Sequence, residues 1–468
     1  MANGLLPYVD FIDVKGPLLF VIQLVGWEIS RGTTTGVWLL ETGAVFLTLL
    51  SLYKLGRVEK LTRSQACLAS LLCLTCMFSS QLYGGGGRVE MYTGCALALL
   101  LWRTCQFYGC GEMLRHEVFR YGIAMGVCFG VCLLMKYNAC LPAAAAGACA
   151  CAYLLHRRRF RAVPALLGGI AAGAGVICLP FAAWMAWEGI LDDCFNVYFK
   201  LNAETLHSSV ELNATRIVWL LSKAVQSSGV VVALFGLPFL FAASWRRDGN
   251  FKAFTLFLVG ISAFVSAFAG QFTYYMLYCS VLAIFPAVIV SRVFYPAISS
   301  KWLILTAVAV SVATVRLNGT WDSQCHMRLT HKTPPAIQAM EDEIGQHPGC
   351  DIMFVGTLDM GLGFNVPALP ACPEWFTLNG APGYYVQRQF EAVRQRKADY
   401  VGLGFLNLEN TEEITRMIEK AGYVPVANQA PNSKTGSPLI LYKLNAPRGE
   451  GGGKVYGAGQ TPAAGVPE

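Results

Sequence analysis

Long apolar runs dominate this chain and constrain its fold more than any other feature. About ten of them reach the roughly twenty residues that a helix needs to cross the hydrocarbon core of a bilayer. They cover residues 35–54, 64–82, 91–108, 119–136, 139–155, 162–184, 226–245, 252–270, 274–292 and 301–317. Only 14% of the 468 residues are charged, far fewer than a soluble protein of this length carries. The pattern predicts an α-helical polytopic membrane protein with about ten transmembrane helices.

Basic residues gather in short loops between these runs. The loops lie at 54–63, 156–161, 245–252 and 292–301. Counting the spans places them all on one side, which lysine- and arginine-rich loops mark as cytoplasmic. We therefore expect an integral protein of the plasma membrane, with residues 1–17 and everything after residue 317 outside the cytoplasm. The run 18–29 is too short to cross and is expected to form a juxtamembrane helix near the outer surface.

The composition changes after residue 317, where charged residues return. We expect a transmembrane domain over residues 1–317, a small extracytoplasmic α/β domain over 318–446, and a disordered tail rich in Gly, Pro and Ala over 447–468. Within the α/β domain the pattern predicts strands at 352–356, 400–404, 423–426 and 439–444, and helices at 384–397 and 411–420.

Neither the net charge nor the cysteines point to a further ligand. The basic loops account for the net charge of +7, and no segment has the basic and aromatic pattern of nucleic-acid binders. Most of the 17 cysteines fall inside apolar runs, where Cys acts as a small apolar side chain. They form no zinc pattern. The sequence assigns no cofactor, and a divalent cation stays an open alternative.

A charged segment precedes the run 18–29. Asp10, Asp13 and Lys15 stand between two prolines that stiffen the backbone, and Gly16 permits the close approach of another group. Charges that flank a membrane helix are common, so one alternative is a solvated helix cap. The other is a site where charge is needed.

The segment Gly4–Leu18 resembles the first external loop of bacterial polytopic glycosyltransferases of the GT-C type, which include the family 39 protein mannosyltransferases and the aminoarabinose transferases of lipid A. Many of these carry G-x-x-P-Y-x-D-x-x-D-x-K-G-P-L. The resemblance implies an inverting hexosyl- or pentosyltransferase that moves a sugar from a polyprenyl-phosphate donor to a glycan, lipid or protein acceptor of the cell envelope. In that reading Asp10 and Asp13 are catalytic carboxylates and Lys15 binds the donor phosphate.

A second segment, Gly84–Tyr92, resembles the G-G-x-x-x-E-x-Y segment of the same bacterial proteins. The resemblance implies that Glu90 is a further catalytic carboxylate and that Arg88 contacts the donor phosphate. The alternative is a flexible hairpin whose Arg88 and Glu90 contact lipid headgroups.

The segment Lys136-Tyr-Asn138 interrupts apolar sequence between two spans, where the relatives often have a basic residue followed by Asn. The resemblance implies that Lys136 and Asn138 bind the donor phosphate. An ionisable residue near membrane depth indicates function, whereas a lysine that merely snorkels to the surface is the alternative. Tyr274, Tyr275 and Tyr278 resemble an aromatic cluster in which the relatives often have a Tyr and a His. The expected His is absent, so a belt of interfacial aromatic residues is the preferred interpretation.

The loop 188–225 mixes charged and apolar residues in a pattern that predicts an amphipathic interfacial helix. It is either a flap over an active site or a cover on the membrane surface. The rival to a glycosyltransferase is a transporter or flippase of envelope lipids or saccharides. A transporter is expected to have internal repeats and polar breaks at mid-membrane, whereas the polar candidates here gather at the outer ends of the spans.

The families that this chain resembles have one more membrane span before the first loop, with a leading catalytic Asp beyond its outer end. Met1 stands only a few residues before that loop, and Asp10 matches the second acidic position of the family rather than the leading one. We therefore expect the natural reading frame to continue upstream. The form that begins at Met1 is expected to be weakly active or inactive.

Overall fold

The computed structural model describes most of the chain as two compact units. The described residues are 4–30, 35–78, 88–109, 114–204, 236–238, 240, 250–268, 273–294, 305, 335–356, 368–378, 382–404, 411–429 and 439–445. The first unit comprises those within 1–7 and 13–331, and the second those within 8–12 and 332–468. The predicted spans 226–245 and 301–317 lie almost wholly outside the described residues, and the predicted tail does so entirely.

The first unit is built from helices that follow the apolar runs. They are α1 (Pro17–Ile29), α2 (Thr35–Val58), α3 (Arg63–Met77), α5 (Val89–Gly109), α6 (Arg115–Met135), α7 (Leu141–His156), α8 (Val163–Trp187), α13 (Phe251–Phe268) and α14 (Ile284–Phe294). Among the described residues, 4 helical stretches are long and apolar enough to cross a membrane. These are Thr35–Val58, Arg115–Met135, Tyr137–His156 and Phe160–Trp187. The count of ten spans stays a prediction.

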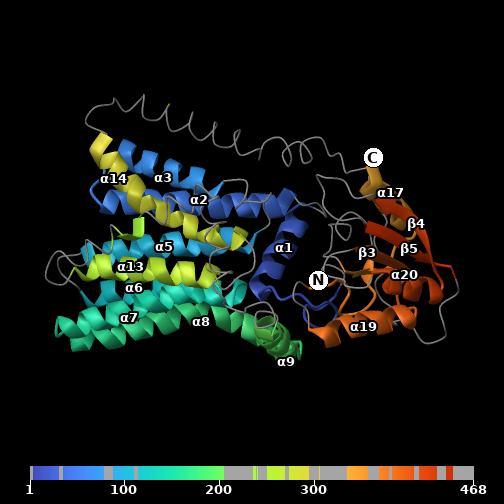
Figure 1. Ribbon diagram of the computed structural model, residues 1–468. Coiled ribbons are helices and arrows are strands. Elements are labelled where there is room, and N and C mark those ends of the chain that lie inside the picture. Colours follow the sequence, from blue (N-terminus) through green and yellow to red (C-terminus); the bar gives the residue numbers. More distant parts are fainter. Residues whose placement is uncertain are drawn as a thin grey trace. The chain divides into compact units, whose positions relative to one another are not determined.

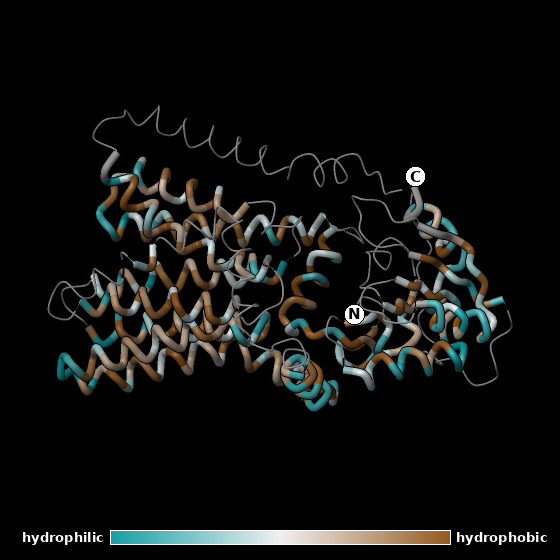
Figure 2. The backbone as a smooth tube through the Cα atoms, in the orientation of Figure 1, coloured by the Kyte–Doolittle hydropathy of each residue, from teal (hydrophilic) through white to brown (hydrophobic). Residues whose placement is uncertain are grey.

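Helix α1 differs from the long helices in its direction. In Figure 1 it runs across α2, α5 and α6 at one end of these helices, whereas they run side by side. Apolar residues cover most of the long helices, and hydrophilic residues gather near their ends (Figure 2). A short apolar helix that lies across the end of such a bundle is the arrangement expected of a juxtamembrane helix.

Helices α6 and α8 pack closely through glycines spaced four residues apart. Gly122 and Gly126 of α6 face Gly169 and Gly173 of α8. A Cβ added at Gly126 would lie 2.1 Å from a backbone carbonyl oxygen of α8, and one added at Gly173 would lie 2.2 Å from a carbonyl oxygen of α6. Small residues at this spacing let two membrane helices approach each other closely.

Because of this packing, neighbouring glycines of α8 differ in how well they tolerate a Cβ atom. We expect Gly169→Ala to destabilise the protein by about 1–3 kcal/mol, since its Cβ would lie 2.3 Å from the backbone of α6 and overpack the contact. Gly168→Ala is the matched control, because its nearest neighbour would lie 3.9 Å away. Thermal unfolding in detergent compares the two. Equal melting temperatures would contradict the close packing.

The segment 273–294 differs from the single transmembrane helix predicted for 274–292. Two 3-10 helices, η4 (Thr273–Met276) and η5 (Tyr278–Ala283), precede α14. Pro286 lacks an N–H and crowds the carbonyl four residues before it, which disfavours a regular α-helix here. The Cys73 thiol donates to the carbonyls of Ser280 at 3.5 Å and Val281 at 3.4 Å. The thiol thereby provides a hydrogen-bond donor for two backbone carbonyls where the helix is interrupted.

The second unit contains a mixed sheet in the order β2-β1-β3-β5-β4. The strands are β1 (Asp351–Val355), β2 (Leu369–Pro370), β3 (Tyr400–Gly404), β4 (Tyr423–Gln429) and β5 (Leu439–Leu444). Strand β1 runs parallel to β2 and β3, and β5 runs antiparallel to β3 and β4. The helices are α17 (Pro335–Gly345), α19 (Gly383–Arg394) and α20 (Thr411–Lys420). All strands and helices predicted for this unit are confirmed, whereas α17 and β2 were not predicted.

Candidate functional site

A buried ion pair joins the start of α5 to the end of α6. Glu90 lies in the first turn of α5 and is 2% exposed, and Lys136 directly follows the last residue of α6. Lys136 Nζ lies 2.8 Å from Glu90 Oε1. Charges withdrawn from water are tolerated when they are paired. This burial argues against the alternatives in which Lys136 snorkels and Glu90 contacts headgroups.

Residues of three further elements surround this pair. Lys136 Nζ lies 3.0 Å from the centre of the Tyr275 ring of η4, a cation–π contact. Asn138, in the 3-10 helix η1 (Tyr137–Cys140), donates from Nδ2 to the carbonyl of Ser266 on α13 at 3.0 Å. Among the described residues, Asn138 Oδ1 is a buried atom with no hydrogen-bond partner. The end of α6 therefore combines a fixed cation with an open hydrogen-bond acceptor.

Gly16 links the first loop to this end of α6 through a backbone hydrogen bond. Its N–H donates to the carbonyl of Met135 at 3.2 Å. A Cβ at this position would lie 2.0 Å from the carbonyl oxygen of Leu134, so only glycine permits the contact. Because Lys15 precedes Gly16 and Lys136 follows Met135, the loop and the buried ion pair meet at the same place in the first unit.

Asp13 and Lys15 form a second, more exposed ion pair within the loop. Lys15 Nζ lies 2.7 Å from Asp13 Oδ2, and the Lys15 N–H donates to Asp13 Oδ1 at 3.3 Å. The Lys15 side chain is 48% exposed and that of Asp13 is 15% exposed. Lys15 can therefore reach solvent, while the Asp13 carboxylate is held by the backbone.

The described part of the loop 188–225 reaches the same place. Helix α9 (Leu191–Cys194) continues as the π-helix η3 (Phe195–Leu201). Asn202 Nδ2 donates to the carbonyl of Val14 at 3.2 Å, and the Tyr198 hydroxyl donates to that of Leu133 at 2.7 Å. A π-helix is rare and often marks a functional position. These contacts join the described part of the loop to the first loop and to the end of α6.

Asp10 and Arg88 are the remaining predicted site residues. Asp10 belongs to the residues 8–12 that are grouped with the second unit, where the Ile12 N–H donates to the Pro373 carbonyl at 2.8 Å. Arg88 immediately precedes α5, and its carbonyl accepts from the Met91 N–H at 3.1 Å. Their roles stay predictions. Among the described residues, no group of three or more His, Cys, Asp or Glu side chains is placed to hold a metal ion.

Sequence reasoning singled out Tyr275 and Asn202 but did not predict their partners, Lys136 and Val14. The sequence favours an interfacial belt for Tyr275, because nothing near Tyr275 in the sequence indicates that Lys136, at the end of α6, packs against its ring. The belt interpretation is wrong for Tyr278, which is 2% exposed and whose hydroxyl hydrogen-bonds Ser266. Asn202 lay within the predicted flap, yet its partner Val14 is a backbone carbonyl that no side-chain pattern reveals.

Apolar helices packed through glycines, with a buried ion pair at one end of α5 and α6 and with a small α/β unit, define a polytopic integral membrane protein. No protein-family model and no curated protein matches the chain. Two crystal structures of ArnT from Cupriavidus metallidurans are similar to it, each with a TM-score of 0.59. The one bound to undecaprenyl phosphate is 13% identical and the match covers 94% of this chain and 89% of ArnT; the apo structure is 14% identical, with 92% and 88% covered. The chain therefore has the fold of this GT-C glycosyltransferase, and the resemblance is confirmed for the fold.

Proposed function

We propose that the protein is a membrane glycosyltransferase that moves a sugar from a polyprenyl-phosphate donor to a cell-envelope acceptor on the extracytoplasmic side. The observation that carries the proposal is the buried Glu90–Lys136 pair at 2.8 Å, at the place where Gly16 fastens the first loop. ArnT, which shares the fold, was crystallised with undecaprenyl phosphate.

The reaction would need a cation for the donor phosphate and a carboxylate for the acceptor. The acceptor hydroxyl oxygen attacks the anomeric carbon as the bond from that carbon to the phosphate oxygen breaks. Polyprenyl phosphate leaves with the electron pair, and the hydroxyl proton passes to a carboxylate. A single displacement of this kind inverts the anomeric carbon, whether the sugar is a hexose or a pentose. Lys136 and Lys15 are assigned to the departing phosphate, and Asp13 and Glu90 to the carboxylates.

The pairing of each lysine with a carboxylate supports a mechanism in which the donor phosphate replaces the carboxylate as the partner of the lysine. Lys15 and Lys136 are held at 2.7 Å and 2.8 Å from Asp13 and Glu90. A phosphate that approaches either lysine competes with that carboxylate for the ammonium group. The carboxylate is then released to accept a proton or a hydrogen bond, so donor binding would prepare the base.

Three more residues are assigned roles in the reaction. Asn138 Oδ1, the open buried acceptor, suits a hydroxyl of the sugar, and the Asn138 amide group retains a hydrogen for phosphate oxygen. Arg88 is assigned to the donor phosphate because it stands beside α5 and its Glu90. Asp10 is assigned as a further catalytic carboxylate, because the resemblance of the first loop implies that role.

A transporter or flippase of envelope lipids or saccharides is the alternative, and proteoliposomes separate the two. A polyprenyl-phosphate donor carrying a labelled sugar is enclosed with an envelope extract as the source of acceptor. The proposal predicts that label leaves the lipid for the acceptor and that free polyprenyl phosphate appears in equal amount. If the labelled lipid crosses the bilayer intact and no polyprenyl phosphate is freed, the protein is a transporter.

The proposed side of the membrane has its own test. The four basic loops are predicted to be cytoplasmic, so the second unit is expected outside the cytoplasm. A reporter that is active only in the cytoplasm, fused after Lys443, should give no signal, and the same reporter inserted in the loop 156–161 should be active. Strong signal from the Lys443 fusion would reverse the orientation and remove the proposed site from the outer surface.

A further inference from the structure

Tyr278 connects the interrupted segment 273–294 to the end of α13. Its side chain is 2% exposed, and its hydroxyl donates to the carbonyl of Ala263 and is hydrogen-bonded to Ser266 Oγ. A phenol has one hydrogen to donate, so the Ser266 hydroxyl is the donor in the bond between the two side chains. Both partners lie in the last two turns of α13. Tyr278 therefore fixes the end of α13 from η5.

The same end of α13 holds Asn138. Helix α13 ends at Phe268, so the Ser266 carbonyl is one of the last four carbonyls, which have no N–H partner within the helix. Asn138 Nδ2 donates to this carbonyl at 3.0 Å, so one hydrogen of the amide group is committed to it. The direction of the other amide hydrogen and of Oδ1 then depends on the position of the Ser266 carbonyl.

Two tyrosines of the interrupted segment support two residues of the proposed donor site. Tyr275 of η4 contacts Lys136, whose Nζ lies 3.0 Å from the centre of the tyrosine ring. Tyr278 of η5 reaches Asn138 through Ser266. The interruption of the helix therefore places one tyrosine at the cation and the other behind the amide.

The surroundings of Tyr278 leave its ring no alternative position. A cavity of about 10 Å³ borders the ring and is lined otherwise by residues of α5, α6 and α7 and by Ala139 of η1. A volume of this size holds one water molecule at most. The ring is therefore held by packing, and its hydroxyl points to α13 in a fixed direction.

We propose that Tyr278 is a positioning residue of the donor site, which acts through Ser266 on Asn138. This inference rests on the proposed function. With the end of α13 fixed, the Asn138 amide presents one N–H to a phosphate oxygen and its open acceptor Oδ1 to a hydroxyl of the donor sugar. Without the Tyr278 hydroxyl the Ser266 carbonyl is no longer held in place. The Asn138 amide then turns more freely, which weakens donor binding.

The test measures the affinity of undecaprenyl phosphate for the full chain in detergent. Tyr278→Phe keeps the ring that fills the core and removes the hydroxyl, so binding is expected to weaken about tenfold, which corresponds to about 1.4 kcal/mol. Ser266→Ala leaves the bond from Tyr278 to Ala263 and should weaken binding only about threefold. Added to Asn138→Ala, Tyr278→Phe should cause no further loss, because it acts through the amide that is already absent.

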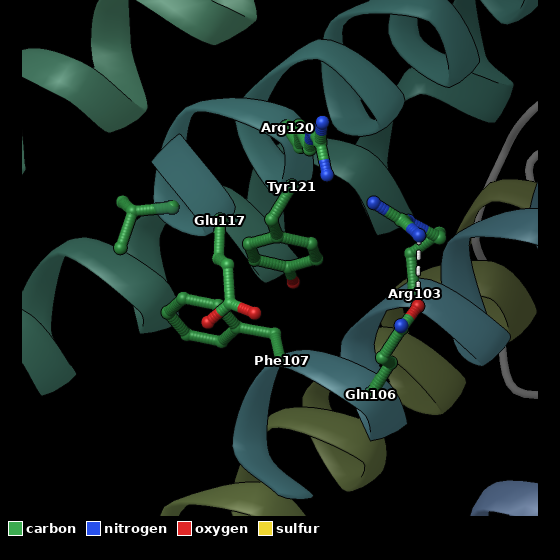
Figure 3. A pocket seen from close by; sticks show the side chains of 7 residues that line it. Arg103, Gln106, Phe107, Glu117, Arg120 and Tyr121 are labelled. Atoms are coloured by element: carbon green, nitrogen blue, oxygen red, sulfur yellow. Dashed lines mark hydrogen bonds between the residues drawn. The ribbon is translucent and has the colours of Figure 1, made fainter. Parts of the chain in front are cut away.

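Tyr121→Phe is the matched control. Tyr121 is also 2% exposed, and its hydroxyl is hydrogen-bonded to Thr104 Oγ1 at 3.0 Å. Its ring stacks on that of Phe107 in a separate cavity of about 100 Å³ (Figure 3). Thr104 follows Glu90 by 14 residues on α5, which places it about 20 Å along the helix from the buried ion pair. The control should lower the melting temperature as Tyr278→Phe does and leave the affinity unchanged.

Wild-type affinity of a folded Tyr278→Phe variant would overturn the proposal. A Tyr278→Phe/Asn138→Ala variant whose loss equals the product of the two single losses would also overturn it, because Tyr278 would then act independently of Asn138. Transfer assays beside the affinities keep the proposed function apart. Affinities that follow the expected pattern without sugar transfer would contradict the reaction and leave the positioning role intact. A wild type that does not bind undecaprenyl phosphate would contradict both.

Discussion

Glu90→Gln and Lys136→Met are each expected to lower the free energy of unfolding by about 3–5 kcal/mol, because either change leaves one buried charge without its partner. The two side chains are 3% and 17% exposed and lie 2.8 Å apart, so water cannot replace the missing partner. Thermal and denaturant unfolding in detergent measure the loss. Transfer activity is expected to disappear in both variants.

The double variant Glu90→Gln/Lys136→Met separates stability from function. It removes both charges together, so much of the lost stability should return. The loss of unfolding free energy in the double variant should be well below the sum of the losses in the two single variants. Activity should not return, because the cation for the donor phosphate is gone. Arg416→Gln is the control, since Arg416 and Glu412 form an exposed pair, 78% and 91% exposed, worth about 0.3–0.5 kcal/mol. A double variant with full activity would leave the pair a purely structural role.

Asp13→Asn is expected to slow transfer by about 10²–10⁴-fold, the range that general-base catalysis contributes. The substitution preserves the size of the side chain and leaves an oxygen to accept from the Lys15 N–H, which Asp13 Oδ1 now does at 3.3 Å. Stability should change by less than about 1 kcal/mol, because the ion pair with Lys15 is partly exposed. Initial rates with a polyprenyl-phosphate donor, beside melting temperatures, provide the measurement.

Asp192→Asn is the matched control for Asp13→Asn. Asp192 is an exposed carboxylate of α9 and has no role in the proposed reaction. Its removal should leave the rate unchanged. An Asp13→Asn variant that transfers sugar at the full rate would return the first loop to the role of a helix cap.

The helices could be predicted because a lipid environment imposes a simple rule on the backbone. Polar backbone groups must be satisfied within each spanning segment, so length and apolarity locate the helices. The same rule cannot reveal that 273–294 is interrupted, because a broken helix and a continuous one have equal hydropathy. Pro286 was the available signal. In the second unit β2 is only two residues long, Leu369–Pro370, which is too short for any periodicity.

The sequence predicted several residues of the candidate site but not the contacts between them. Resemblance singled out Glu90 and Lys136, yet their pairing across 46 residues depends on how α5 packs against α6. Gly16 was expected to allow a close approach, and the structure identifies the partner as the backbone of Leu134 and Met135. We expect Asp13, Lys15 and Glu90 to face one outward-opening cavity with apolar walls, since the donor phosphate and the acceptor must meet there. A pattern of side chains in the sequence cannot predict contacts to the backbone of distant residues.

The central claim is that Lys136 receives the donor phosphate at the outer end of α6. Its most direct test is the affinity of undecaprenyl phosphate for the wild type and for the Glu90→Gln/Lys136→Met double variant, whose fold is expected to be retained. Lys136→Arg, which keeps the charge, serves as the control and should retain most of the affinity. The account predicts that the double variant binds about a hundredfold more weakly, a difference of about 2.7 kcal/mol. Equal affinity of the wild type and a folded double variant would contradict it.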